Sequence, residues 1–438
     1  MKILLYSSQK SNRLEYIVQV IFSQILSVEC LITNDLDYFI QYQLPKIFYG
    51  VTDLNILNIP ASSFIFEQTL NQNLDFQPKN KGEDLTLFSQ NNSGLGFDIF
   101  SASFYIVSRY EEYLPHKKDN FERFIGKNST LTKFEAIEFP MLHIWALKLG
   151  NYIQTHYPHF EFKLPNFHFI PSIDIDIAFA YKGRNVKRQV LALGKQALKF
   201  NIIGLKDRVL TLLQLKKDPY DTYSIIENLA TVHHKKWKLF LQCGHYQNQT
   251  DKSIIQKNSF YQHLIQDWKK WADVGLHPSV KASNEFDFLK SELETYKIVA
   301  QNECFNSRQH YLSIYFPDTY NNLIKLGIKN DFSMGYADVV GFRAGIAIPY
   351  PHFDLITNEV TSLTIHPFQI MDGTLQQYLQ LNPTEAMEKF RQLANVCKKY
   401  GGNFTILWHN QSFSDTENWK GWKNTFITMF EEAIKYEE

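Results

Sequence analysis

The stretch PSIDIDIAFAY, from Pro171 to Tyr181, places two carboxylates inside an otherwise apolar run. Asp174 and Asp176 alternate with isoleucines, a period of two that is typical of a strand. Residues two apart in a strand face the same side, so we expect both acids on one face of a sheet. Burying two like charges together costs free energy unless something compensates them. The segment is therefore a candidate functional site.

Short strand-like runs continue beyond this stretch and alternate with helix-length segments. The runs are FHFIPSIDID, KWKLFLQCG, VGLHPS, RQHYLSIYF, KNDFSMGY, VTSLTIHPFQI and GGNFTILWHN. Such alternation predicts a parallel sheet, either open or closed as a barrel. A similar pattern fills the first 80 or so residues and is followed by a helical region. We expect an α/β protein, with an N-terminal α/β domain of unknown function at residues 1–160 and a second domain at residues 161–438.

Ionisable side chains stand where several of these predicted strands end. Parallel strands bring their carboxyl ends to one edge of a sheet, so these side chains are expected to converge. Two carboxylates and three imidazoles can supply a metal site with an open position and an acid/base pair. The competing interpretation is a set of loop-capping acids beside core histidines. The converging residues are Asp174, Asp176, His277, His310 and His409.

Composition narrows the classes of function. Lys plus Arg and Asp plus Glu both number 45, so no net charge attracts nucleic acid or an acidic membrane. The four cysteines lie far apart without a CxxC pair, which predicts reduced, buried thiols. No apolar run is suited to a membrane span, and MKILLYSS is typical of a first strand rather than of a signal peptide. These features predict a cytoplasmic protein of unknown oligomeric state.

The second half of the chain resembles the polysaccharide deacetylases of carbohydrate esterase family 4, which have a NodB-like domain. The resemblance covers about residues 165–435 and implies a distorted (β/α)7-type barrel and metal-dependent removal of acetyl groups from sugars. SIDID resembles the family motif T-F-D-D-G, which implies that Asp174 is the catalytic base and Asp176 a metal ligand. DVGLHPSVKAS resembles the motif H-[ST]-x-x-H and implies that His277 is a second ligand.

Two later segments extend this resemblance. SRQHYLSIYFPDTY resembles the third motif and makes Arg308 its arginine, and TILWHN resembles the last motif and makes His409 the general acid. The combination of GLHPS, RQHY, GFRAG, PFQIMDGTL and LWHN is closest to a divergent bacterial branch of the family. In that branch an uncharacterised domain precedes the barrel, and SRYEEYLP resembles its signature.

The sequence departs from the family pattern at the metal ligands. Ile175 separates two acids that are adjacent in the family, and Lys281 stands where the second histidine of the metal motif is expected. A protonated lysine cannot coordinate a metal. We expect His310 to replace the missing ligand and to complete an Asp-His-His site for a divalent metal, most consistent with zinc. The alternative for His310 is a packed imidazole bonded to a neighbour.

Two charged residues after later strands are further candidates. Arg343 in VVGFRAG is expected to hold Asp174 ionised, and Asp372 in FQIMDGT is expected to orient an imidazole such as His409. Either residue is equally consistent with an ordinary salt bridge. The charges of SRYEEY are predicted to hold a helix end against a neighbouring domain rather than to act in catalysis.

These residues together predict a metal-dependent hydrolase that removes an N- or O-linked acetyl group from a carbohydrate, such as an acetylated sugar or a glycan precursor. Neither nucleic acid nor a membrane span is expected among its interactions. The alternative is a catalytically silent barrel that binds glycans or proteins, for which the absent second histidine is the main support. Bound metal in the purified protein distinguishes the two.

Overall fold

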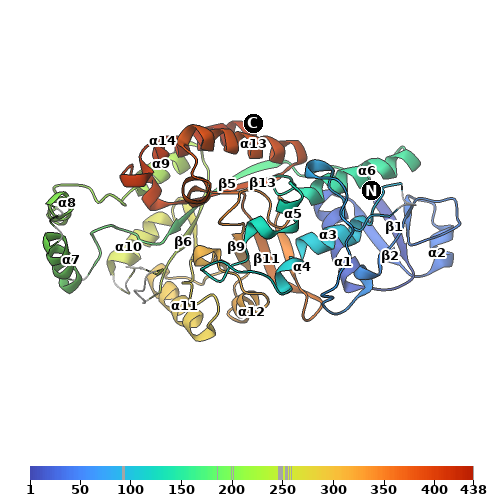
Figure 1. The fold of residues 1–438 in the computed structure, drawn as a ribbon, viewed down its shortest axis with the longest axis horizontal. Coiled ribbons are helices and arrows are strands. Elements are labelled where there is room, and N and C mark those ends of the chain that lie inside the picture. The colour runs from blue at the N-terminus through green and yellow to red at the C-terminus, as the bar shows by residue number, and fades with distance from the viewer. Residues whose placement is uncertain are drawn as a thin grey trace.

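A four-stranded sheet and a nine-stranded sheet organise the chain (Figure 1). The structure is a computed structural model that describes residues 1–90, 94–184, 186–198, 200, 202–244, 250–251, 255, 257 and 259–437. Helices accompany both sheets, so the α/β organisation predicted from the alternation of strands and helices is confirmed.

The first sheet is parallel and has the order β2-β1-β3-β4. Its central strand β1 is buried along almost its whole length, as expected for an apolar run covered on both faces. Helix α1 begins after Ser11, whose hydroxyl accepts the amide proton of Leu14, and a π-helical segment, Gln19–Ile25, extends it. The elements are β1 (Lys2–Ser7), α1 (Asn12–Val18), β2 (Glu29–Thr33), α2 (Leu36–Gln41), β3 (Lys46–Tyr49), β4 (Asn58–Ile59), α3 (Ile99–Val107), α4 (Tyr110–Tyr113), α5 (Thr130–Lys133) and α6 (Met141–His156).

The second sheet has the order β10-β11-β9-β8-β7-β6-β5-β13-β12. Every neighbouring pair is parallel except β10 and β11. Within the described ranges β10 and β12 remain at opposite edges, so a closed barrel is not confirmed. The strands are β5 (Phe167–Ile175), β6 (Trp237–Leu241), β7 (Ala272–Leu276), β8 (Asn306–Ser307), β9 (Asn330–Met334), β10 (Tyr350–Asp354), β11 (Glu359–Pro367), β12 (Ile370–Met371) and β13 (Gly402–His409).

Helices follow most of these strands and pack on the sheet. Helix α14 lies against β5, α13 against β13 and α11 against β7. Helix α13 begins with a capping box, in which the side chains of Asn382 and Glu385 each accept the backbone amide proton of the other. The helices are α7 (Val186–Leu198), α8 (Ile202–Leu212), α9 (Tyr223–Val232), α10 (Ser259–Trp268), α11 (Phe286–Ala300), α12 (Asp318–Lys325), α13 (Pro383–Tyr400) and α14 (Trp422–Glu437).

The predicted strand RQHYLSIYF, residues 308–316, is wrong. Only the two residues before it pair as β8, and a short 3-10 turn follows at His310–Leu312. Tyr311 and Leu312 have φ values of 57° and 58°, a left-handed backbone that cannot continue a strand ladder. The chain therefore turns directly after His310 instead of extending along the sheet.

One continuous apolar core runs beneath both sheets. Phe353 on β10 packs against the rings of Tyr16 on α1 and Phe104 on α3, at centroid distances of 5.1 and 5.0 Å. All four cysteines are free, as predicted, although Cys30 is only partly buried. No helix in the described part of the chain is long and apolar enough to cross a membrane.

Candidate metal centre

The structure brings together the five residues that were expected to converge at the strand ends. Their strands, β13, β5, β7 and β8, lie within one run of five neighbours in the sheet, with β6 between β5 and β7. The pairing of β13 with β5 sets His409 directly beside Asp174. Hydrogen bonds also fix the backbone of two histidines: the amide of His277 donates to Leu241, and that of His310 donates to Pro278.

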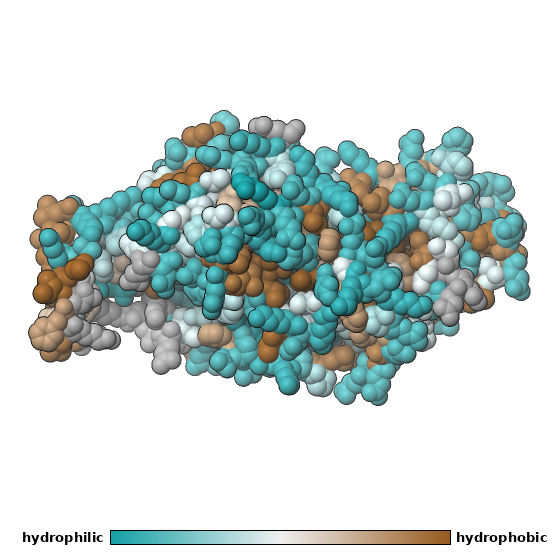
Figure 2. Space-filling model, turned by 45° about the horizontal axis from the view of Figure 1, so that its top comes forward, coloured by the Kyte–Doolittle hydropathy of each residue, from teal (hydrophilic) through white to brown (hydrophobic). Residues whose placement is uncertain are grey.

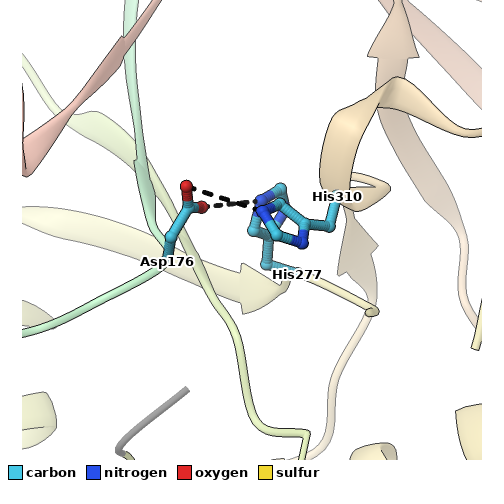
Figure 3. Close-up of side chains that lie close together, drawn as sticks. All are labelled: Asp176, His277 and His310. Carbon is cyan, nitrogen blue, oxygen red and sulfur yellow. Dashed lines mark ion pairs between the residues drawn. The ribbon is translucent and has the colours of Figure 1, made fainter. Parts of the chain in front are cut away.

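Asp176, His277 and His310 form the centre of this group (Figure 3). Oδ1 of Asp176 lies 3.2 Å from Nε2 of His277, and Oδ2 lies 3.5 Å from Nε2 of His310. One possible ligand atom from each residue lies within 4.8 Å of the other two. Imidazole nitrogen and carboxylate oxygen are the donors that zinc and similar divalent cations take in proteins.

The other nitrogen of each imidazole is held by an acceptor. Nδ1 of His277 lies 2.5 Å from the carbonyl oxygen of Arg308, and Nδ1 of His310 lies 2.8 Å from a carboxylate oxygen of Asp251. Both oxygens can only accept a hydrogen bond, so each favours a proton on Nδ1, although the side-chain amide of Gln242 also lies 2.8 Å from Nδ1 of His310. The two Nε2 atoms are thereby directed to the centre of the group, which is how metal-binding histidines are usually oriented.

Among the residues that the structure describes, two buried atoms of the centre that could ligate a metal have no hydrogen-bond partner. They are Nε2 of His277 and Oδ1 of Asp176, and they face one another. Two lone pairs at this distance repel each other, and burying them without a partner costs free energy. A divalent cation between them would remove both costs, so the residues present fit a metal ion.

The charges at the centre also favour a bound cation. Burial alone would raise the pKa of Asp176, but the charges of His310 and His409 hold that pKa well below its usual range. Burial likewise opposes protonation of His310, but Asp176 and Asp251 outweigh it and raise its pKa to about 9. The carboxylates thus create a site of strong negative potential, which a proton occupies on His310 or a cation occupies in its place.

Asp174 lies beside the centre and has its own cationic partner. Nη1 of Arg308 donates to Oδ1 of Asp174 at 2.9 Å, while Oδ2 lies 3.7 Å from Nε2 of His277. Both side chains are buried, so solvent screens this ion pair little. The assignment of Arg343 to this role is wrong, because the Arg343 guanidinium donates to Glu112 and to the carbonyl of Gly335 instead.

His409 also lies near Asp176, with Nε2 at 3.9 Å from Oδ2. Its Nδ1 lies 2.7 Å from Asp372, as expected for a residue that orients the imidazole. The other oxygen of Asp372 accepts from the His409 amide and from the hydroxyl of Ser412. Burial lowers the pKa of His409, but the charges of Asp372 and Asp176 outweigh it and raise the pKa to about 10. The imidazole is therefore protonated near neutral pH and can act as an acid.

A cavity of about 150 Å³ opens over these residues. Aromatic side chains and one arginine form part of its wall: Arg123, Tyr311, Tyr378 and Trp419. The guanidinium of Arg123 donates to the carbonyl of Tyr311, to the hydroxyl of Tyr378 and to Asp119. Arg123 belongs to the N-terminal part of the chain, so both parts line the cavity. Aromatic side chains with a few placed polar groups are a usual lining of sites that bind small molecules.

Sequence reasoning missed Asp251 and Arg123. Asp251 is buried between β6 and β7, where its Oδ1 also accepts from the amides of Gln242 and Val280. It lies in the polar segment QNQTDKS, which has no periodicity and no motif. The only signal for Asp251 in the sequence was its place in the loop that follows a predicted strand, at the edge of the sheet where the other site residues lie. Arg123 has no local signal, because the contact with Tyr311 joins residues 188 positions apart.

Comparison with known proteins gives a family match for the N-terminal part of the chain. Residues 3–158 match the "Family of unknown function (DUF7033)". No curated protein matches the chain. Among solved structures, one described as "Crystal structure of putative polysaccharide deacetylase from Mycobacterium smegmatis" has 11% sequence identity and a TM-score of 0.39, and the match covers 62% of this chain and 84% of that chain. A function for this chain therefore has to be argued from the site itself.

Proposed function

We propose that this protein is a metal-dependent hydrolase in which Asp176, His277 and His310 hold a divalent cation, with zinc the best match to the donors. The observation that carries the proposal is the pair of buried, unpartnered donor atoms on His277 and Asp176, with Nε2 of His310 beside them. The resemblance of the motifs to polysaccharide deacetylases and the aromatic wall of the cavity favour an acetylated carbohydrate as substrate.

A divalent cation bound there would polarise the substrate carbonyl and lower the pKa of a nearby water. Asp174, stabilised as a carboxylate by Arg308, accepts the proton of the attacking water. His409, held by Asp372, donates a proton to the departing nitrogen or oxygen. Tyr311, Tyr378 and Trp419 contact the sugar and position its acetyl group in the cavity.

The proposal assigns these roles within two domains, residues 1–160 and 161–438. The second domain supplies the proposed ligands and the acid/base pair. The first domain supplies Arg123 to the cavity wall. Arg343 takes no part in the proposed chemistry, because its contacts lie at Glu112.

Zinc titration of the dialysed protein by calorimetry tests the metal centre. The wild-type chain should bind about one ion, and His277→Ala and His310→Ala should each weaken binding by about a hundredfold or more, since loss of an orienting residue alone costs 10–100-fold. Lys281→Ala is the matched control, because this lysine extends over the ring of Phe288 and should leave affinity unchanged. A wild-type site that zinc does not fill would overturn the proposal.

Acetate release from N-acetylated and O-acetylated oligosaccharides tests the reaction. Release that requires the metal supports the proposed hydrolase. A chain that binds zinc and oligosaccharide but releases no acetate supports the alternative, a silent glycan-binding module. Release of other acyl groups in preference to acetate would keep the metal centre and replace the substrate.

A further inference from the structure

Helices α7 and α8 form a hairpin that leaves the sheet directly after β5. The two helices pack against each other. Figure 1 places them at the end of the molecule opposite the N-terminal sheet. The proposed metal centre and the hairpin both follow strand β5, since α7 begins ten residues after Asp176. The hairpin therefore projects from the carboxyl end of the sheet, where the cavity also lies.

The tip of this hairpin is apolar and exposed. Leu198, Phe200, Ile202 and Ile203 have 83, 87, 74 and 77% of their surface accessible to solvent. Figure 2 shows hydrophobic residues gathered at this end of the molecule. Single exposed apolar residues are common, but four large ones within six positions form a patch of the kind that marks an interaction surface.

The same segment is strongly basic. Residues 182–217 contain ten of the 45 Lys and Arg residues of the chain but only one of its 45 Asp and Glu residues. The rest of the chain is consequently acidic, and the balanced total conceals this separation of charge. The expectation of no attraction to an acidic membrane rested on the neutral total, and that charge balance does not describe this segment.

The base of the hairpin is fixed to the body of the protein. The buried carboxylate of Asp218 accepts the backbone amide protons of Ala180, Tyr181 and Lys182, and so joins the two ends of the hairpin. The guanidinium of Arg208 on α8 donates to the side chain of Gln189 on α7. An apolar tip is thus presented on a supported pair of helices rather than on a frayed terminus.

We propose that the α7–α8 hairpin binds the surface of an anionic membrane. Leu198, Phe200, Ile202 and Ile203 enter the lipid at the level of the headgroups, and exposed lysines of the hairpin, such as Lys206, contact lipid phosphates. With 13 and 11 residues, α7 and α8 are shorter than the roughly 20 residues that a helix needs to cross a bilayer, so the hairpin lies at the surface.

The charge distribution favours this occupant over a second copy of the chain. Two such hairpins packed together would place basic residues against basic residues, which is unfavourable. A lipid surface instead offers negative charge over a wide area and accepts apolar side chains between its headgroups. The inference does not depend on the chemistry of the metal centre, and its test uses no activity measurement.

Flotation of the full-length protein with lipid vesicles tests this inference. One vesicle contains equal parts of phosphatidylglycerol and phosphatidylcholine, and the other contains phosphatidylcholine alone. We expect at least about tenfold stronger partitioning onto the anionic vesicle, because each basic residue near a charged surface adds to the attraction. Raising the salt concentration from about 0.1 M to 1 M shortens the Debye length from about 10 to 3 Å and should weaken this binding.

A tip variant and a matched control locate the binding surface. Replacing the four tip residues together by serine should reduce partitioning about tenfold or more, since each apolar side chain contributes to burial in the lipid. These side chains are exposed, so the circular dichroism spectrum and the melting temperature should change little. The control replaces four exposed apolar residues of loops elsewhere, Leu44, Val51, Leu54 and Ile356, by serine and should bind as the wild type does.

Three outcomes would overturn the inference. The first is equal binding, or no binding, to anionic and neutral vesicles. The second is a tip variant that binds like the wild type. The third is a wild-type protein that ignores vesicles but sediments as a dimer, which the tip variant converts to a monomer; the tip would then be a self-association surface.

Discussion

Two groups of buried charges in this molecule have similar composition but different bonding. The first, here called the interface cluster, consists of Arg109, Glu112 and Arg343 and joins the N-terminal part to the C-terminal part. Glu112 accepts from Nε of both arginines at 2.9 Å and from Nη2 of Arg343 at 2.5 Å. Arg109 also donates to the carbonyl of Arg343 and the hydroxyl of Tyr336. The second group is the candidate metal centre, where Nε2 of His277 and Oδ1 of Asp176 have no hydrogen-bond partner among the described residues.

The difference shows how a structural charge cluster can be told from a site. In the interface cluster every side-chain nitrogen and oxygen of the three residues has a partner, so no buried polar atom there is left unsatisfied. In the metal centre, the second nitrogen of each imidazole is held while the first is left open. Both groups contain buried charges, but only the atoms without a hydrogen-bond partner in the second group indicate a ligand.

The largest effect is expected at Asp174. Asp174→Asn keeps the shape of the side chain and removes its ability to accept a proton, so turnover should fall by about 10²–10⁴-fold while zinc remains bound. Acetate release and calorimetric zinc titration measure the two quantities. Asp176→Asn is the comparison and should lose zinc as well. Equal loss of zinc in both variants would show that both acids are ligands.

The interface cluster should respond through stability instead. Glu112→Gln leaves the buried Arg343 without its counter-charge, while Arg109 keeps only its ion pair with Glu111. Breaking a buried pair in this way costs about 3–5 kcal/mol of the free energy of unfolding. Urea denaturation measures this loss. Glu135→Gln, which removes an exposed pair with Lys81, is the control and should cost about 1 kcal/mol or less. Retention of full stability in Glu112→Gln would remove the distinction between the two groups.

Acid should weaken the interface cluster in a defined range of pH. Burial opposes ionisation of Glu112, but Arg343 and Arg109 outweigh it and lower its pKa from 4.5 to about 2. The unfolded chain therefore takes up this proton at a higher pH than the folded chain. The contribution of Glu112 to stability is complete above about pH 5 and is lost as pH falls from there towards 2, at up to about 1.4 kcal/mol per pH unit.

Urea denaturation between pH 6 and pH 3 checks this dependence. The difference in unfolding free energy between the wild type and Glu112→Gln should shrink as the pH falls, because the glutamine does not titrate. A constant difference over this range would mean that the Glu112 carboxylate is not held ionised by the arginines.

A smaller effect is expected at Asp251, which holds the imidazole of a proposed ligand in orientation. Asp251→Asn should lower zinc affinity by about 10–100-fold, because the amide holds the imidazole of His310 less firmly in orientation. Asp273→Asn, at a partly exposed pair with Lys238, is the control and should leave zinc affinity unchanged. An unaltered affinity in Asp251→Asn would show that His310 needs no such support.

Periodicity was enough to place most of the centre. The alternating run around Asp174 forms β5, and the ends of β7 and β13 carry His277 and His409 where the strand pattern predicts them. These positions follow from local geometry, because the carboxyl ends of neighbouring parallel strands meet at one edge.

Contacts between distant segments were beyond the same reasoning. Arg343 was paired with the wrong carboxylate, since the choice between Asp174 and Glu112 depends on how two parts of the chain pack. The strand predicted at residues 308–316 is wrong because the backbone turns at Tyr311 with a left-handed conformation. Such a turn is usually marked by glycine or asparagine, and this segment has neither. The net charge of the whole chain is zero, so it did not indicate that residues 182–217 are basic.

The cavity wall has a consequence for how this protein can change over evolutionary time. Strand ends supply the residues to which we assign the chemistry, whereas Arg123 reaches the cavity from the other part of the chain. Substitutions at Arg123 can alter which molecule is admitted while every reacting atom stays in place. Selection can therefore change recognition without changing the proposed chemistry. Relatives with the same residues at the strand ends need not bind the same molecule.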